Sequence, residues 1–206
     1  MKWKRFGNTR QFAIDVRVFR GFSRTLWGEM RWWLNGRELK HDGEYADVRG
    51  ATGWGMDWLT IEADREIWSE LATAEDAMIH FSEYSHTDPD PGEVPYWLWP
   101  VEEQLRRQAT EIDHIGVQAL LDCWRIVSVR TPKGDWILAR ELNTRELIDH
   151  HIPAGETRRV VEQFCTWMIQ NHCARPKGWN GRTTVMPKRS SESAAQGNKG
   201  KGAPRS

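Results

Sequence analysis

Two alternating segments near the start of the chain restrict its fold more than any other feature of the sequence. In residues 11–20 (QFAIDVRVFR), apolar and polar side chains alternate, which is the two-residue period of a strand with one buried face. Residues 26–34 (LWGEMRWWL) are a second strand candidate, rich in aromatic residues. Asn35 and Gly36 follow it, the dipeptide that supplies the positive φ angles of a type I′ turn. The chain is therefore expected to open as an antiparallel meander.

The C-terminal half predicts a second hairpin and a long helix. Residues 123–130 and 136–142 are strand candidates on either side of a Pro/Gly turn at residues 131–135, and residues 146–153 are a further strand candidate. In residues 157–172, apolar side chains recur with the spacing of an amphipathic helix that packs on a sheet. We therefore expect an α+β fold, an antiparallel sheet of about five to six strands packed against helices.

The middle of the chain predicts a loop and short helices. Three glycines in residues 50–55 lack the order of a phosphate-binding motif and are interpreted as a loop. Helical spacing or composition is seen in residues 62–71, 73–84 and 101–109. Thr73, with Asp76 three residues later, is typical of a capped helix N-terminus.

Charge is distributed unevenly along the chain, although the formal net charge is zero. Residues 1–49 hold 11 basic and 6 acidic side chains, whereas residues 57–113 hold 3 basic and 15 acidic ones, a net charge of −12. Such a segment favours a cationic partner and repels phosphate backbones. Residues 1–175 together carry 22 basic and 28 acidic side chains, which is the wrong balance for a nucleic-acid-binding domain.

A proline-rich stretch, residues 85–100 (SHTDPDPGEVPYWLWP), combines carboxylates with a rigid aromatic cluster. Proline excludes this stretch from helix interiors and central strands, so it is expected to be an ordered loop or an edge. Loops carry binding function more often than scaffold elements do, and tryptophan is enriched at the centres of interfaces. The predicted partner-binding residues are Glu83, Asp88, Asp90, Glu93, Tyr96, Trp97, Trp99, Glu102 and Glu103.

The last part of the chain differs in composition from the rest. Residues 176–206 are rich in Gly, Ser, Lys and Arg and carry almost no aliphatic side chains, so they are expected to be a disordered basic tail. Residues 1–175 are then a single domain. Three cysteines are too few for a disulfide scaffold, and the sequence shows neither a signal-peptide pattern nor a long apolar run. These features predict a cytoplasmic protein.

Patterns of catalytic and metal-binding chemistry are missing from the sequence. His150 and His151 are adjacent, so in a strand they would point to opposite faces and could not bind one ion together. Neither the spacings of a zinc site nor a nucleophile elbow occur. We expect no cofactor, no metal and no enzyme activity. Two alternatives stay open: a small enzyme or ligand-binding protein with a pocket near His114, His150 and His151, and a nucleic-acid accessory protein that acts through the basic tail.

Several motifs near the two ends of the folded region are shared with a known family. They are Phe6-Gly7, Phe12-Ala13-Ile14, Trp32-Trp33-Leu34-Asn35-Gly36-Arg37-Glu38, His151-x-Pro153-x-Gly155-Glu156, and Val160-Val161-Glu162-Gln163-Phe164-x-x-Trp167. In these residues the chain resembles the small α+β immunity proteins of bacterial polymorphic toxin systems, in particular immunity protein family forty-two. The proline-rich loop and the basic tail depart from that family.

The resemblance implies a non-enzymatic protein that binds a cognate toxin domain and thereby neutralises it. It carries over no catalytic residue. It implies a scaffold role for its matching side chains, with Phe12, Ile14, Trp32, Leu34, Val160, Phe164 and Trp167 in the core. A cationic toxin would suit the acidic segment, which was found independently of the resemblance.

Overall fold

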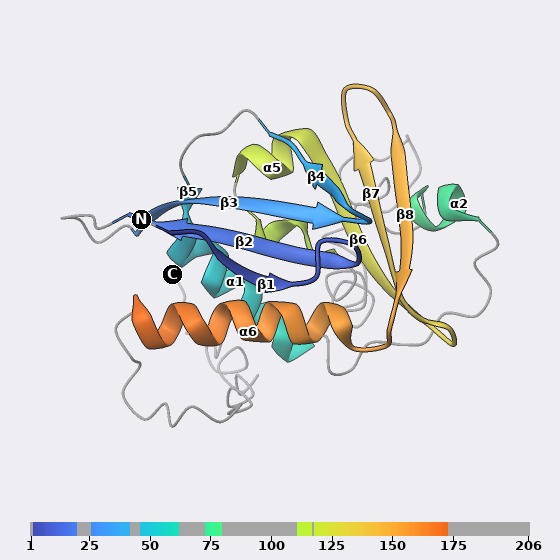
Figure 1. Ribbon diagram of the computed structural model, residues 1–206. Coiled ribbons are helices and arrows are strands. Elements are labelled where there is room, and N and C mark those ends of the chain that lie inside the picture. Colours follow the sequence, from blue (N-terminus) through green and yellow to red (C-terminus); the bar gives the residue numbers. More distant parts are fainter. Residues whose placement is uncertain are drawn as a thin grey trace, which may run out of the picture.

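The computed structural model describes residues 2–19, 26–41, 46–61, 73–79, 111–116 and 118–172. The strands are β1 (Lys4–Gly7), β2 (Phe12–Val18), β3 (Trp27–Leu34), β4 (Arg37–Leu39), β5 (Ala46–Asp47), β6 (Trp124–Thr131), β7 (Gly134–Glu141) and β8 (Leu147–Ile152). The helices are α1 (Val48–Ile61), α2 (Ala74–Met78), the 3₁₀ turn η4 (Asp113–Ile115), α5 (Gln118–Cys123) and α6 (Glu156–Asn171). Figure 1 shows their arrangement.

The N-terminal strands form the predicted antiparallel meander. The order is β1-β2-β3-β4, and β5 pairs with the other end of β3. Phe12 lies opposite Leu34 in the register, and the turn residues Asn35 and Gly36 have φ angles of 50° and 80°. The type of turn is therefore set by the Asn-Gly dipeptide, because both residues tolerate positive φ. β1 adds an edge strand that the sequence patterns did not indicate.

The remaining strands form a second antiparallel sheet, β6-β7-β8. All three were predicted, and the tight turn between β6 and β7 depends on Gly134, whose φ is 128°. A Cβ at this position would lie 2.3 Å from the carbonyl oxygen of Ile152, so only glycine fits. The α+β antiparallel prediction is confirmed. The division into two sheets was not foreseen, because strand partners from distant segments cannot be read from local patterns.

Helix α1 replaces the loop that was predicted for residues 50–55. Gly55 lies where α1 crosses α6, and a Cβ on it would be 2.6 Å from Cys165 Sγ. The glycine is thus required by close packing of two helices rather than by a turn. Tertiary contacts override its poor helix propensity, which costs about 1 kcal/mol relative to alanine.

Helix α6 matches the prediction for residues 157–172 and joins the two sheets. In Figure 1 it runs alongside β1 and β2. Its first turn is anchored to the second sheet, because the backbone N–H of Thr157 donates to Asp135 Oδ2 at 3.2 Å and Ser128 Oγ donates to Thr157 Oγ1 at 3.1 Å. Asp135 is fully buried there, and its acceptor oxygen satisfies one of the N–H groups that a helix start leaves open.

One continuous core draws on both sheets and both long helices. It includes Phe12, Ile14, Trp32, Leu34, Trp58, Trp124, Ile126, Ile137, Val160, Val161, Phe164 and Met168. Six of the seven core residues that the family resemblance implied are buried, and the seventh, Trp167, packs partly buried against this cluster. A smaller cluster on the other side of the second sheet joins Val127, Val129, Trp136 and Leu138 to Ala77 and Met78.

Other predictions have mixed outcomes. The Thr73 cap is confirmed, since the backbone N–H of Asp76 donates to Thr73 Oγ1 at 3.1 Å. The predicted helices at residues 62–71 and 101–109 and the predicted basic tail at residues 176–206 lie outside the described residues. Among the helices in the described ranges, none is long and apolar enough to cross a membrane.

Candidate protein-binding face

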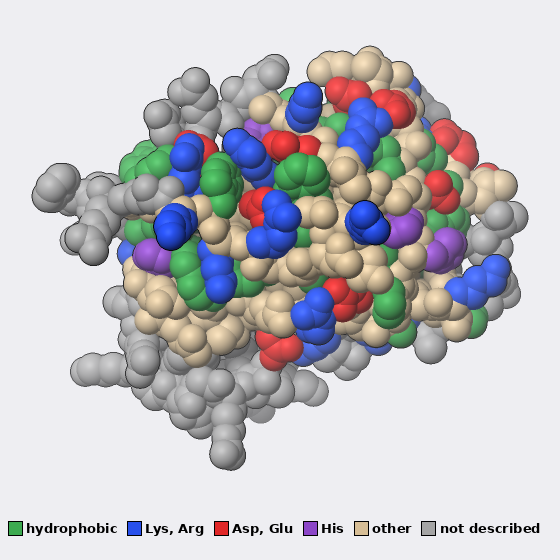
Figure 2. Space-filling view, viewed as in Figure 1, with side chains coloured by type: hydrophobic (Ala, Val, Ile, Leu, Met, Phe, Trp, Pro, Cys, Tyr) green, Lys and Arg blue, Asp and Glu red, His purple; other side chains and the backbone are tan. Residues whose placement is uncertain are grey.

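The meander exposes one of its two faces. The strand period places Phe12, Ile14 and Val16 on the inner face against the helices, so the intervening residues lie on the outer face. Arginine, carboxylate and aromatic side chains occupy this outer face, and Trp3 and Phe19 join it through ring contacts with Arg17. The set is here named the Arg–Trp face: Trp3, Arg5, Asp15, Arg17, Phe19, Glu29, Arg31, Trp33 and Glu38. In Figure 2, basic side chains stand among acidic and hydrophobic ones over these strands.

Asp15 organises the middle of the face. Its two carboxylate oxygens accept from Arg5 Nε and Nη2, both at 2.7 Å, and Oδ2 also accepts from the indole N–H of Trp33 at 3.0 Å. These hydrogen bonds raise the pKa of the Arg5 guanidinium above its ordinary value. Asp15 is only 4% exposed, because the Arg5 guanidinium and the Trp33 indole cover its carboxylate. A bidentate pair of this kind fixes the plane of the arginine.

Two further ion pairs cross between strands. Arg17 Nη2 donates to both oxygens of Glu29 at 2.5 Å, and the two residues lie directly opposite in the register of β2 and β3. Arg31 approaches Glu38 on β4 at 3.6 Å. Each described arginine of the face therefore has a carboxylate beside it on a neighbouring strand.

The same arginines also make cation–π contacts with tryptophan rings. The Arg31 guanidinium lies 4.3 Å from the centre of the Trp3 ring, and the Arg17 guanidinium lies 5.0 Å from the same ring. Arg5 lies 5.5 Å from the Trp33 ring. These distances are within the range of cation–π attraction, so Trp3 and Trp33 orient the guanidinium groups that the carboxylates already bind.

A further ion pair connects the meander to the second sheet. Arg37, at the start of β4, donates to both oxygens of Glu146, just before β8, and its Nη2 lies 2.8 Å from Glu146 Oε2. The hydrogen bonds from Arg37 lower the pKa of Glu146 below its ordinary value. Both side chains are exposed, so the pair is screened by solvent and adds little stability.

The Arg–Trp face contains two residue types that are enriched in protein interfaces. Tryptophan and arginine are the residue types that most often dominate binding energy, and here they are held in place before any partner arrives. Their order reduces the conformational entropy that binding would otherwise cost.

The predicted partner-binding residues are elsewhere in the chain. Glu83, Asp88, Asp90, Glu93, Tyr96, Trp97, Trp99, Glu102 and Glu103 all lie outside the described residues. Sequence reasoning missed the Arg–Trp face because it gave weight to the density of charge and proline. The signal was present in the polar positions of the strand at residues 11–20 and in the arginine and tryptophan positions of residues 26–34.

The alternative of a ligand pocket near His114, His150 and His151 can be compared with the structure only in part. His150 and His151 alternate along β8 as expected, and the His151 ring stacks on Trp136 with centroids 5.0 Å apart and 9° between the planes. The side chain of His114 lies outside the described part. In the ranges that the structure describes, no three His, Cys, Asp or Glu side chains are grouped as a metal site requires.

Comparison with known proteins gives a likeness of fold. No protein-family model and no curated protein matches the chain. Among solved structures, CdiI from Burkholderia dolosa AUO158 is similar, with a TM-score of 0.55 and 15% sequence identity. The match covers 78% of this chain and 97% of CdiI. The chain therefore has a fold similar to that of CdiI over nearly the whole of that protein, which agrees with the kind of α+β fold that the sequence resemblance implied.

Proposed function

We propose that this chain is an immunity protein that binds and neutralises a cognate bacterial toxin domain and catalyses no reaction. The observation that carries the proposal is the likeness of fold to CdiI, a contact-dependent inhibition immunity protein, over 97% of its length. The motifs at both ends of the folded region point independently to the same class of protein. An immunity protein of this kind acts in the cytoplasm of the cell that makes the toxin.

Neutralisation by binding needs a rigid surface rather than a catalytic pocket. The scaffold supports this role, because ion pairs and ring contacts within the free protein already order the side chains on the outer face of its first sheet. The two sheets and α6 form a single core behind it. Such a scaffold can present a binding surface without rearranging, which favours tight association.

The toxin-binding residues are proposed to be those of the acidic and aromatic segment, Glu83 to Glu103. Its aromatic side chains would supply affinity, and its carboxylates would increase the association rate with a cationic toxin. The net charge of −12 over residues 57–113 supports a cationic partner.

The function is tested by co-expressing the chain with the product of the adjacent upstream gene, followed by a pull-down on an N-terminal tag and a growth assay. We expect a stoichiometric complex, and we expect the partner to stop growth when it is expressed alone. A partner that is harmless alone, or growth arrest that this chain does not relieve, would contradict the proposal.

The binding segment is tested by the double variant Trp97→Ala, Trp99→Ala. We expect the toxin complex to lose more than about 2 kcal/mol of binding free energy, because buried tryptophans dominate interfaces. Isothermal calorimetry measures the loss. Trp54→Ala is the matched control, since Trp54 is 58% exposed on α1 and lies far from the segment in sequence. Equal affinity of the double variant and the wild type would remove the segment from the interface.

A further inference from the structure

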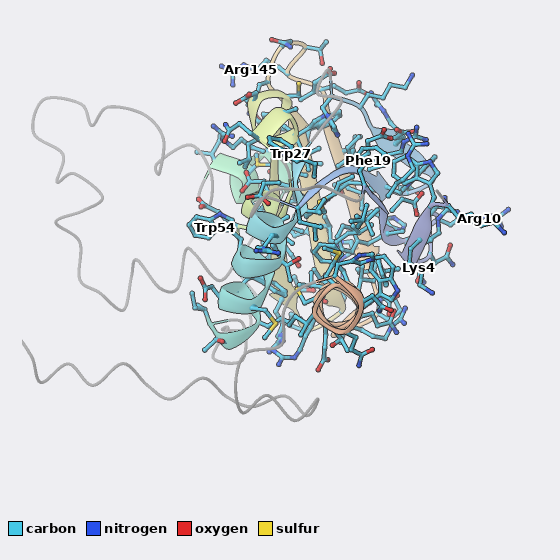
Figure 3. All side chains as sticks on the ribbon, turned by 90° about the vertical axis from the view of Figure 1, so that its left-hand side faces the viewer. Lys4, Arg10, Phe19, Trp27, Trp54 and Arg145 are labelled. Atoms are coloured by element: carbon cyan, nitrogen blue, oxygen red, sulfur yellow. The ribbon has the colours of Figure 1, made fainter. Side chains whose placement is uncertain are left out.

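The Arg–Trp face has a charge that its own ion pairs do not balance. Three arginines and three carboxylates on the face cancel one another. Arg10 lies beside it in the β1–β2 turn and Lys40 follows β4, and neither is in an ion pair within the described part of the chain. Lys4 faces the other way, since it lies opposite Val16 in the register and its Nζ is 6.0 Å from the centre of the Phe6 ring. Viewed along the strands in Figure 3, Arg10 and Phe19 lie on the side of the sheet away from α1. The face is therefore neutral at its centre and positive at its rim.

The arginines are ordered but still accessible. Arg5 and Arg31 have side-chain exposures of 51% and 45%, although each is held by a carboxylate and a tryptophan ring. A guanidinium has five N–H donors, and Arg5 uses two of them, Nε and Nη2, to bind Asp15. The outward N–H groups can donate to an oxygen of a partner without loss of side-chain order.

The arrangement suits a protein partner better than a nucleic acid. Single-stranded nucleic acids bind where aromatic rings are open for base stacking beside unpaired cations. Here guanidinium groups already lie over Trp3 and Trp33, and Asp15 and Glu29 stand between the arginines. Carboxylates on a folded protein can be spaced to meet the separate guanidinium edges and the two cations of the rim, whereas a regular phosphate backbone would also meet the acidic positions.

We infer that the Arg–Trp face is a second docking surface, for an acidic protein segment whose carboxylates bind the exposed edges of Arg5 and Arg31 and the rim residues Arg10 and Lys40. The excess of positive charge on the rim also disfavours a second copy of this chain, since two such rims would repel each other. This inference does not depend on the toxin-binding function, because the segment proposed for the toxin has the opposite charge.

The test uses the full chain and a random copolymer of glutamate and tyrosine in a 4:1 ratio as the probe, measured by fluorescence anisotropy at low and high salt. We expect binding that weakens as salt increases, because the rim contacts are exposed. Arg31→Ala should weaken binding by about fivefold or more. Arg31→Lys should weaken it by nearly as much, because lysine keeps the charge but loses the planar contact with Trp3.

Lys133→Ala is the matched control, since it removes a basic residue from the β6–β7 turn, away from the meander. We expect it to bind the copolymer as the wild type does. An equal loss in Lys133→Ala and Arg31→Ala, or full binding by Arg31→Lys, would overturn the inference. Competition by a 20-residue oligo-dT that depends on Arg31 to the same extent would overturn it in favour of a general polyanion site. Circular dichroism confirms that each variant is folded.

Discussion

Gly53 and Gly55 lie on the same helix, α1, but have opposite surroundings. A Cβ on Gly53 would meet nothing within 4 Å, whereas a Cβ on Gly55 would lie 2.6 Å from Cys165 Sγ and 3.4 Å from Ile115 Cγ2. Alanine improves helix propensity equally at both positions. We expect Gly53→Ala to stabilise the protein by about 0.5–1 kcal/mol and Gly55→Ala to be about 1–3 kcal/mol less stable than Gly53→Ala, because the added methyl group overpacks the helix contact.

Urea unfolding of the two variants measures this difference directly. Because the change in propensity cancels between them, the difference in unfolding free energy reports the steric contact of α1 with α6. Equal stabilities would mean that the two helices can separate without cost, and the close approach at Gly55 would then be of no energetic importance.

Single residues also show how far sequence reasoning reaches. Asn35 and Gly36 could be placed in a turn of known type because the dipeptide itself restricts φ. Gly55 could not be assigned, because a glycine is compatible with both a loop and a close helix contact. Its role is decided by Cys165, which lies 110 residues further along the chain.

At the scale of elements, the end of α6 provides a pH-dependent contact. His172 follows the helix and packs against the edge of Trp167, with ring centroids 4.7 Å apart. Burial lowers the pKa of His172 below its ordinary value of 6.5. The unfolded chain then binds a proton more readily than the folded protein, so the contribution of His172 to stability is complete above pH 6.5 and falls as the pH drops below it.

An NMR titration of the His172 ring checks the direction of this shift, and urea midpoints at pH 7.5 and 5.5 check its effect. The loss of stability between the two pH values should be smaller in His172→Gln than in the wild type. A pKa above 6.5 would show instead that the negative end of the helix dipole outweighs burial.

Strands with one solvated face were the easiest elements to predict. β2 and β3 alternate because one side of the sheet faces water, and α6 shows a clear apolar stripe because only one side of it packs. β6 and β7 are buried along most of their length, since clusters of apolar side chains cover both faces. Their turn residues revealed them, but no local pattern shows which sheet a strand joins.

At the scale of the whole molecule, the buried residues that the structure describes extend only as far as α6. The last buried residue that the structure describes is Ile169, in the final turns of α6. We propose that residues 1–175 fold as one domain, and we expect a variant that ends at Arg175 to melt within about 2 °C of the full chain. Differential scanning calorimetry measures this, and a larger drop would place residues 176–206 in the folded domain.

The distribution of charge was visible in the sequence, but its arrangement in space was not. Residues 1–49 carry a net charge of +5, and the structure shows that ion pairs across strands cancel the charge of Arg5, Arg17 and Arg31. These partners are 7 to 12 residues apart, so their pairing depends on strand register. The toxin-binding role of the acidic and aromatic residues from Glu83 to Glu103 remains a prediction, because they lie outside the described residues.

The position of α6 has a consequence for synthesis on the ribosome. The inner face of β1 and β2 is covered by α6, which begins at Glu156, about 150 residues after β1. Synthesis adds about 5–20 residues per second, so the apolar face of the meander stays uncovered for roughly 7 to 30 s before α6 has been made. A chain that stops early leaves this face open to aggregation and proteolysis. In the immunity role proposed above, only finished chains would then neutralise toxin.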